Sequence, residues 1–161
     1  MKNIICFFIS LLPLNFLRII FYNFFLKYNI NHDCKIGFLV ILNCEGLIIQ
    51  NSKISNFNFF KGKYFKSKNT CIKNFNFFKN FEELNFINSK IGKRNKIDGP
   101  DNNTLGSLIL KENTEIQNYN FFDITSSINI GNDCKIDSFC QFWSHGFDSD
   151  RKIKIGNISL E

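Results

Sequence analysis

The sequence of 161 residues contains no alanine, and it has only 2 proline, 1 methionine, 1 tryptophan and 2 histidine residues. Alanine is the best helix former, so its absence beside many asparagine, β-branched and aromatic residues argues against a helical bundle. The scarcity of histidine and the lack of any Cys-x-x-Cys pair leave little material for a zinc site. The composition therefore disfavours all-α folds, and we expect no metal centre.

Arginine is also rare, because it occurs only at Arg18, Arg94 and Arg151. The formal net charge is +6, but it comes mainly from lysines that are scattered among asparagine and phenylalanine. Arginine recognises phosphates and bases better than lysine does, and a coding bias toward A+T inflates Lys, Asn, Ile and Phe together. We therefore expect no nucleic-acid partner.

The six cysteines are scattered and form no metal-binding or disulfide framework. They are Cys6, Cys34, Cys44, Cys71, Cys134 and Cys140. Such spacings are typical of reduced, mostly buried thiols in a cytoplasmic protein.

The first 29 residues differ from the rest of the chain, because Ile4 to Tyr28 is almost continuously apolar. A signal peptide would need a small-residue cleavage site, which is hard to build without alanine. A membrane-spanning helix would carry Pro13 and Arg18 near its middle. The third alternative is a helix from about Leu14 to Lys27, starting after Pro13, that packs on the domain or lies in a membrane interface. The interrupted pattern favours this third interpretation and leaves the other two open.

From residue 30 onward, large apolar residues recur every six positions. The series runs Ile30, Ile36, Leu42, Ile48, Ile54, Phe60, Lys66, Ile72, Phe78 and Leu84, and only Lys66 breaks it. A helix cannot use a step of six, whereas a strand returns to the same face because six is even. Three such rungs form one triangular coil of a parallel β-helix, and coils stack on their neighbours.

The period continues with slips that indicate loops between coils. Residues 98–108 are rich in turn formers and predict an external loop. Isoleucine-glycine pairs at 36–37, 91–92, 130–131 and 155–156 suit rung starts. The residues expected to point inward are Ile36, Leu42, Ile48, Ile54, Ile72, Ile91, Ile97, Ile116, Ile130 and Ile136. We thus expect an all-β protein with a β-helix over 30–161, and a β-sandwich is the alternative.

The segment INIGNDCKIDSFCQFWSHG, from Ile128 to Gly146, followed by KIKIGN, resembles the bacterial hexapeptide-repeat acyltransferases of surface-polysaccharide biosynthesis. That group includes the maltose and galactoside O-acetyltransferases, and the opening LPLNFLRIIF is similar to the helix before their first coil. The resemblance implies a left-handed parallel β-helix, a homotrimer, active sites between subunits, and acetyl- or another acyl-coenzyme A as co-substrate. Members continue with further rungs after the His-bearing loop, so the resemblance implies an incomplete C-terminal end.

Acyl transfer to a hydroxyl needs a base and donors for the oxyanion. His145 is the candidate base, because it follows the rung that ends at Phe142. The resemblance implies that Asn120 binds substrate or assists the oxyanion and that Asp123 holds a substrate hydroxyl or orients the imidazole. Trp143 is a candidate for stacking on a sugar or on the coenzyme.

Asp148 is a weaker candidate for orienting the imidazole, and His32 is expected to have only a structural role. No residue is assigned to coenzyme binding. The expected function is transfer of an acyl group from acyl-coenzyme A to a sugar or lipid-linked glycan, in the cytoplasm and with possible peripheral membrane contact. The alternative is a truncated or decayed acyltransferase that acts as a non-catalytic β-helix protein.

Overall fold

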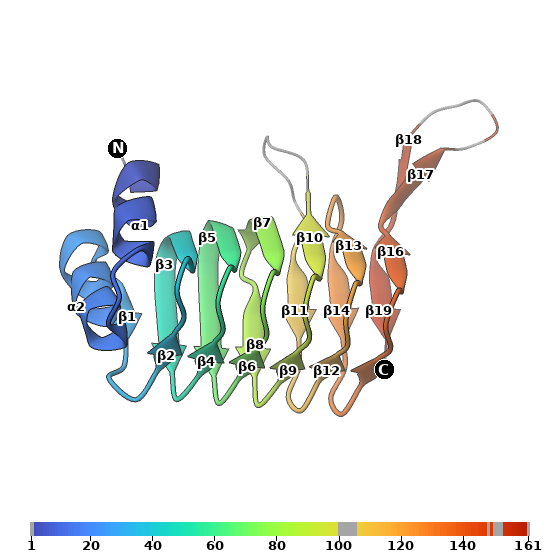
Figure 1. Cartoon of the computed structure of the whole chain (residues 1–161). Coiled ribbons are helices and arrows are strands. Elements are labelled where there is room, and N and C mark those ends of the chain that lie inside the picture. Colours follow the sequence, from blue (N-terminus) through green and yellow to red (C-terminus); the bar gives the residue numbers. More distant parts are fainter. Residues whose placement is uncertain (1, 100–105, 148, 150–152, 161) are drawn as a thin grey trace.

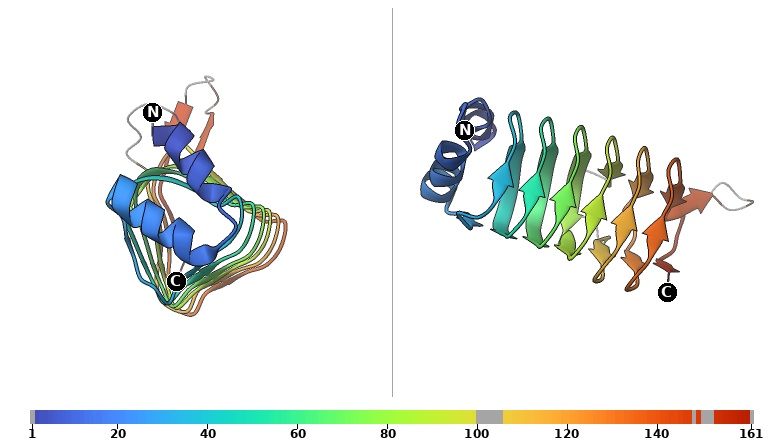
Figure 2. Two further views of the ribbon diagram at one scale, coloured as in Figure 1. Left: turned by 60° about the vertical axis from the view of Figure 1, so that its left-hand side comes forward. Right: turned by 60° about the horizontal axis from the view of Figure 1, so that its bottom comes forward.

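A computed structural model describes residues 2–99, 106–147, 149 and 153–160 (Figure 1). Two helices, α1 (Lys2–Ser10) and α2 (Asn15–Leu26), precede short parallel strands that wind into a β-solenoid of about six turns. The helices lie across one end of the solenoid, and the last strands lie at the other end (Figures 1 and 2). The parallel β-helix predicted from the six-residue period is therefore confirmed.

The apolar N-terminal segment forms two helices, where the sequence suggested one from about Leu14 to Lys27. Helix α2 matches that expectation closely: Leu14 precedes it in an extended conformation, and Lys27 ends it in the left-handed conformation with a φ of 55°. Helix α1 lies before Pro13, whose ring fixes φ and whose nitrogen carries no hydrogen, so the helices are separated there. Among the described residues, neither helix is long and apolar enough to span a membrane.

The inner sides of the helices close the first turn of the solenoid. Cys6, Ile9, Ile19 and Tyr22 are buried there. Arg18 is buried as well, and its Nε donates a hydrogen bond of 2.9 Å to the carbonyl oxygen of Ile36. The arginine that interrupts the apolar segment thus satisfies a main-chain group at the open end of the first strands.

Three faces, each with one strand per turn, give the solenoid a triangular cross-section (Figure 2). The first face contains β7 (Phe77–Glu82), β10 (Lys96–Asp98), β13 (Phe121–Asp123) and β16 (Gln141–Trp143). The second contains β1 (Asn29–Ile30), β8 (Asn85–Ile87), β11 (Leu108–Leu110), β14 (Ile128–Ile130) and β19 (Ile158–Leu160). The long strands β3 (Ile41–Gln50) and β5 (Phe59–Lys68) belong to both faces and join them into one 11-stranded sheet. The third face is a separate 6-stranded sheet of β2 (Lys35–Ile36), β4 (Lys53–Ile54), β6 (Cys71–Ile72), β9 (Lys90–Ile91), β12 (Glu115–Ile116) and β15 (Lys135–Ile136).

Equivalent residues of successive turns stack inside the solenoid. On the third face this column consists of Ile36, Ile54, Ile72, Ile91, Ile116 and Ile136, paired in parallel register. On the first face it consists of Leu42, Phe60, Phe78, Ile97, Phe122 and Phe142. Burying one such side chain is worth about 1.5–3 kcal/mol, so the columns supply the main stabilisation of the fold.

The prediction of inward-pointing residues is wrong only for Ile48. It is half-buried, while its neighbours Leu47 and Ile49 point into the core. The chain turns the corner between the first and second faces at Gly46, with a φ of 77°, and this corner shifts the inward positions by one residue. Lys66 pairs with Ile48 in the next turn, so the same corner turns its side chain outward, and it is exposed. The lysine that breaks the six-residue series therefore does not place a charge in the core.

Asparagines form an exposed ladder at the corner before the third face. Asn51, Asn69 and Asn88 all have positive φ, which asparagine tolerates better than most residues. The Asn51 side-chain amide donates to Asn69 at 2.8 Å, and that of Asn69 donates to Asn88 at 2.9 Å. The abundance of asparagine therefore has a structural use at this corner.

Two predictions concern the chain beyond β10. Most of the predicted loop at 98–108 lies outside the described residues, which leave out 100–105, and Asp98 is the last residue of β10 while Leu108 is the first of β11. The predicted rung at Ile155-Gly156 is wrong. Strand β18 (Ile153–Ile155) pairs antiparallel with β17 (His145–Phe147) in a hairpin that projects from the last turn (Figure 1). The Ile-Gly pattern marks a strand end in both arrangements, so it does not separate a rung from a local hairpin.

Candidate active site

Two insertions in the sequence connect strands of the first face to strands of the second face, across the same corner of the solenoid. One joins β10 to β11, and the other is the hairpin of β17 and β18 between β16 and β19. Gly106, at the end of the first insertion, packs so tightly that a Cβ there would lie 2.1 Å from the carbonyl oxygen of Ile124. Asp123 ends β13 beside this contact, in register with Asp98 on one side and Trp143 on the other.

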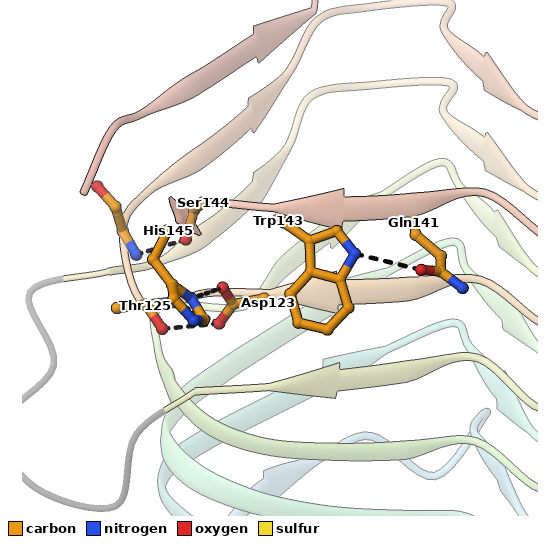
Figure 3. Close-up of polar contacts among 7 residues, drawn as sticks. Asp123, Thr125, Gln141, Trp143, Ser144 and His145 are labelled. Carbon is orange, nitrogen blue, oxygen red and sulfur yellow. Dashed lines mark hydrogen bonds and ion pairs between the residues drawn. The ribbon is translucent and has the colours of Figure 1, made fainter. Parts of the chain in front are cut away.

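At this corner Asp123 and His145 form a hydrogen-bonded pair (Figure 3). Oδ2 of Asp123 contacts Nδ1 of His145. Oδ1 of the same carboxylate accepts hydrogen bonds from the backbone N–H of Thr125 at 3.1 Å and from its Oγ1 at 2.7 Å. The Asp123 side chain is only 7% exposed and that of His145 is 32% exposed. A held carboxylate thus orients an imidazole that remains open to solvent.

The local sequence explains this geometry. Asp-x-Thr favours a turn in which the carboxylate accepts from the N–H two residues on. One turn later, Ser144 Oγ accepts from the backbone N–H of Ser126 at 2.7 Å, and this bond ties the start of the hairpin to the same corner. Hydrogen bonds therefore hold both the Asp123 carboxylate that contacts His145 and the main chain at Ser144 that precedes it.

The contact with a carboxylate indicates which nitrogen of His145 is basic. An ionised carboxylate only accepts hydrogen bonds, so Nδ1 carries the hydrogen that is donated to Asp123. The other nitrogen, Nε2, is then the acceptor of the neutral imidazole. A histidine held in this way can take a proton from a hydroxyl group placed at Nε2.

Trp143 presents an aromatic surface beside this pair (Figure 3). Its side chain is 55% exposed, and its ring centroid lies 6.1 Å from that of His145 and 4.8 Å from that of Phe121. Its Nε1 donates to Gln141 Oε1 at 3.2 Å. An exposed indole held next to a base is suited to stack on an apolar ring face such as that of a sugar.

A charged cluster lies on the neighbouring strands of the same face. Asp98 forms ion pairs with Lys79 at 3.0 Å and with Lys96 at 2.9 Å. Lys96 also lies 5.3 Å from the centroid of the Phe121 ring. The first face therefore carries two lysines and one carboxylate on β10 and β7, beyond β13 as seen from Trp143.

The structure does not bring Asn120 into this site. Asn120 is 1% exposed and belongs to a buried ladder with Asn58, Asn76 and Asn95. Its backbone N–H donates to Asn95, and its Oδ1 accepts from the backbone N–H of Cys140 at 2.8 Å. The expected contact with substrate is therefore not supported, because the side chain points into the solenoid wall.

The remaining candidates are easily placed. His32 is exposed in the turn before β2, in the first coil. Asp148 lies outside the described residues. Sequence reasoning missed Thr125, although the Asp-Ile-Thr pattern at 123–125 is a recognisable signal for it.

Within the part of the chain that the structure describes, no three His, Cys, Asp or Glu side chains gather in a metal-binding arrangement. Comparisons with protein-family models, with curated proteins and with solved structures find no match to this chain.

Proposed function

We propose that the protein is an O-acyltransferase of the hexapeptide-repeat type, with a left-handed parallel β-helix. It would move an acyl group, in the simplest case acetyl, from acyl-coenzyme A to a hydroxyl of a sugar or lipid-linked glycan. The observation that carries the proposal is the hydrogen bond between Asp123 Oδ2 and His145 Nδ1 at the edge of a β-solenoid.

The proposed reaction begins with the neutral imidazole of His145. Nε2 takes the proton from the acceptor hydroxyl as the oxygen attacks the thioester carbonyl. The negative charge that develops on the former carbonyl oxygen requires a hydrogen-bond donor, and we assign it to a main-chain N–H, since Asn120 is buried. Collapse of this intermediate breaks the C–S bond, and the imidazolium returns its proton to the departing coenzyme A sulfur. The products are an ester and free coenzyme A.

The surroundings of the pair support a sugar acceptor. Trp143 offers an exposed ring face next to His145, and Asp98 lies two strands from Trp143, on the other side of Asp123. Stacking on an aromatic ring together with hydrogen bonds to a carboxylate suits a polyol ring better than it suits an apolar alcohol. The acceptor would thus lie across the first face, with its reacting hydroxyl at Nε2.

The experiment measures free thiol released from acetyl-coenzyme A by the purified chain with a panel of sugar acceptors. Because removal of a general base typically costs about 10²–10⁴ in rate, His145→Ala should lose that factor while still folding. His32→Ala is the matched control, since this histidine is exposed in the first coil, and it should retain wild-type activity.

Two results would contradict the proposal. The first is equal thiol release by the wild type and by His145→Ala. The second is no acceptor-dependent thiol release by the wild type across the panel, which would favour a non-catalytic β-helix protein.

A further inference from the structure

The two N-terminal helices expose an apolar surface that the solenoid does not use. We call it the cap surface and define it by its exposed large side chains, which are Ile4, Phe7, Phe8, Leu11, Leu14, Phe16, Ile20, Phe24 and Phe25. An ordinary surface helix buries one apolar stripe and shows a polar side to water. Here both helices are apolar on the buried side and on the exposed side as well.

The cap surface is larger than a monomeric protein normally exposes. Phe8 and Phe24 alone are 63% and 74% exposed. With about 150–250 Å² for each large side chain, the exposed parts amount to several hundred Å² and approach ~1,000 Å². The largest apolar patch of a typical soluble monomer is about 300–600 Å², and larger patches mark interaction sites.

The two helices carry no acidic residue. Residues 2–32 contain no aspartate or glutamate, and Asp33 is the first acidic residue of the chain. Of their basic residues, Arg18 is buried and Lys2 donates a hydrogen bond to the carbonyl oxygen of Cys44 in the first turn. Lys27 is exposed at the end of α2. Phenylalanine-rich apolar surface with basic and no acidic residues is the composition of helices that lie in the interface of anionic membranes.

The arrangement of the helices suits a flat surface. Both lie across the N-terminal end of the solenoid, with their inner sides packed on the first turn (Figure 2). Helix α1 has 9 residues and α2 has 12. At about 1.5 Å per residue they are roughly 14 and 18 Å long, short beside a hydrocarbon core of about 30 Å. They therefore present their outer sides together at the end of the molecule.

From these observations we infer that the cap surface docks on the interface of a membrane that contains anionic lipids. The outer sides of α1 and α2 enter the boundary between head groups and acyl chains, and the solenoid stands away from the bilayer. The fifth strand of the first face, β13, carries Asp123, so at 4.7–4.9 Å per strand the pair with His145 lies roughly 20 Å beyond the first turn.

One consequence rests on the proposed function. With the helix layer of about 10 Å added, the site lies roughly 30 Å from the lipid surface. The acyl acceptor is then a glycan chain long enough to reach that height rather than the sugar attached directly to the lipid.

The test is flotation of the full chain with vesicles of phosphatidylcholine alone and of phosphatidylcholine mixed with phosphatidylglycerol. The wild type should float with the vesicles, and more strongly with the anionic mixture. The double variant Phe8→Asp/Phe24→Asp should partition at least roughly tenfold less, because each phenylalanine contributes about 1.5–3 kcal/mol when fully buried. Both side chains are mostly exposed, so the variant should keep its circular dichroism spectrum and melting temperature.

The matched control is Tyr64→Asp. Tyr64 is an exposed aromatic residue with a positive φ in β5, outside the two helices and one turn beyond the strand β3 that α1 packs on. This variant should float like the wild type. Failure of the wild type to float, or equal flotation of the double variant, would overturn the inference. So would light scattering that shows a dimer held by the cap surface and lost in the double variant, with no vesicle binding. None of these readouts depends on acyltransferase activity.

Discussion

At the scale of single residues, Asp123 is the group on which the candidate site depends. Its carboxylate contacts His145 through one oxygen and accepts two hydrogen bonds from Thr125 through the other. Hydrogen bonds to an ionised group are about twice as strong as neutral ones. The carboxylate therefore sets both the orientation and the tautomer of the imidazole.

Asp123→Asn should abolish most activity without unfolding the protein. The amide nitrogen of asparagine donates to Nδ1, and this moves the imidazole hydrogen to Nε2 and removes the base. The expected loss in kcat/KM is about 10²–10⁴, measured by thiol release, with an unchanged circular dichroism spectrum. Activity within a few-fold of the wild type would show that the carboxylate does not set the tautomer.

Thr125→Val should weaken the same arrangement to a smaller degree. The variant loses the 2.7 Å bond from Oγ1 but keeps the bond from the backbone N–H. Loss of one hydrogen bond to a charged group costs about 1.5–3 kcal/mol, so kcat should fall by roughly tenfold or more. Thr125→Ser retains the hydroxyl and should keep the wild-type rate. If Thr125→Ser is as slow as Thr125→Val, the loss comes from changed packing and not from the missing hydrogen bond.

At the scale of structural elements, the buried asparagine ladder holds one corner of the solenoid together. Asn76 accepts from the backbone N–H of Asn95 at 2.8 Å, and its amide donates to the carbonyl oxygens of Lys73 and Gly92 at 2.8 and 2.9 Å. Buried main-chain groups need hydrogen-bond partners, and the Asn76 side chain supplies them here. The ladder therefore connects successive turns through side chains as well as through strands.

Asn76→Leu should destabilise the protein strongly. A buried polar group left without its partner costs about 1–3 kcal/mol, and this substitution removes the partner of several groups at once. We expect a clear fall in the urea midpoint of unfolding. Asn69→Gly, in the exposed ladder, keeps a residue that accepts a positive φ and should change stability by less than ~1 kcal/mol. Equal effects of both substitutions would contradict a special role for the buried ladder.

The contact between the helices and the first turn should make the protein sensitive to alkali. Burial raises the pKa of the Cys6 thiol from its ordinary value of 9.0 to about 11, and burial also raises the pKa values of Tyr22 and Tyr28. The folded state then keeps protons that the unfolded chain releases above pH 9. Stability is fully present below pH 9 and is lost as the pH rises toward 11.

This prediction is checked by melting temperatures between pH 8 and pH 11, roughly across the interval set by the ordinary and raised values. In Cys6→Ala the melting temperature should fall less over this pH interval, because the buried thiol is absent. A wild-type melting temperature that stays constant through this interval would contradict the burial of these groups in the folded state.

The strands also show which parts of the fold could be predicted from the sequence. The six-residue step predicts the inward columns of the third and first faces. In each turn, the inward isoleucine of the third face is followed six residues later by the inward residue of the first face. This step misplaces Ile48, because a corner at Gly46 shifts the alternation by one residue. It also predicts a rung at Ile155, because a step of six cannot tell a parallel neighbour from a local antiparallel one.

The candidate site was predictable only in part. His145, Asp123 and Trp143 follow from the resemblance and lie together in the structure. The resemblance implies that Asn120 binds substrate or assists the oxyanion, yet its side chain belongs to the buried asparagine ladder. Asparagine is so frequent in this chain that neither frequency nor spacing separates a ligand from a ladder residue, whereas burial does.

At the scale of the whole molecule, one edge of the solenoid exposes a ridge of stacked side chains. The ridge consists of Phe57, Phe75, Arg94, Tyr119 and Phe139, all with positive φ. Phe57 stacks on Phe75 and Tyr119 stacks on Phe139, each at 5.0 Å, and Arg94 lies between the pairs at 5.8 and 5.5 Å from the facing rings. Each ring of the ridge is covered on its faces by the stacked side chains of adjacent turns, so its edges are the part available to another protein surface.

A homotrimer, which the resemblance to the hexapeptide-repeat acyltransferases implies, would give this ridge a partner. Light scattering should give a mass of about 57 kDa, three times the 18.9 kDa of the chain. Phe75→Asp should reduce that mass, because a charge at the ridge would have to be buried without a partner. A wild-type mass of one chain at micromolar concentration would contradict the trimer. In a parallel trimer, three cap surfaces would face the same side and would strengthen membrane docking.

We propose that His145 drives acyl transfer from coenzyme A to a glycan hydroxyl. This role is tested most directly by mass spectrometry of the acceptor after incubation with acetyl-coenzyme A labelled with ¹³C in the acetyl group. The wild type and His32→Ala should place the label on the acceptor as an ester, with an equal amount of free coenzyme A, and His145→Ala should place almost none. Release of coenzyme A without label on the acceptor, or full labelling by His145→Ala, would contradict the claim.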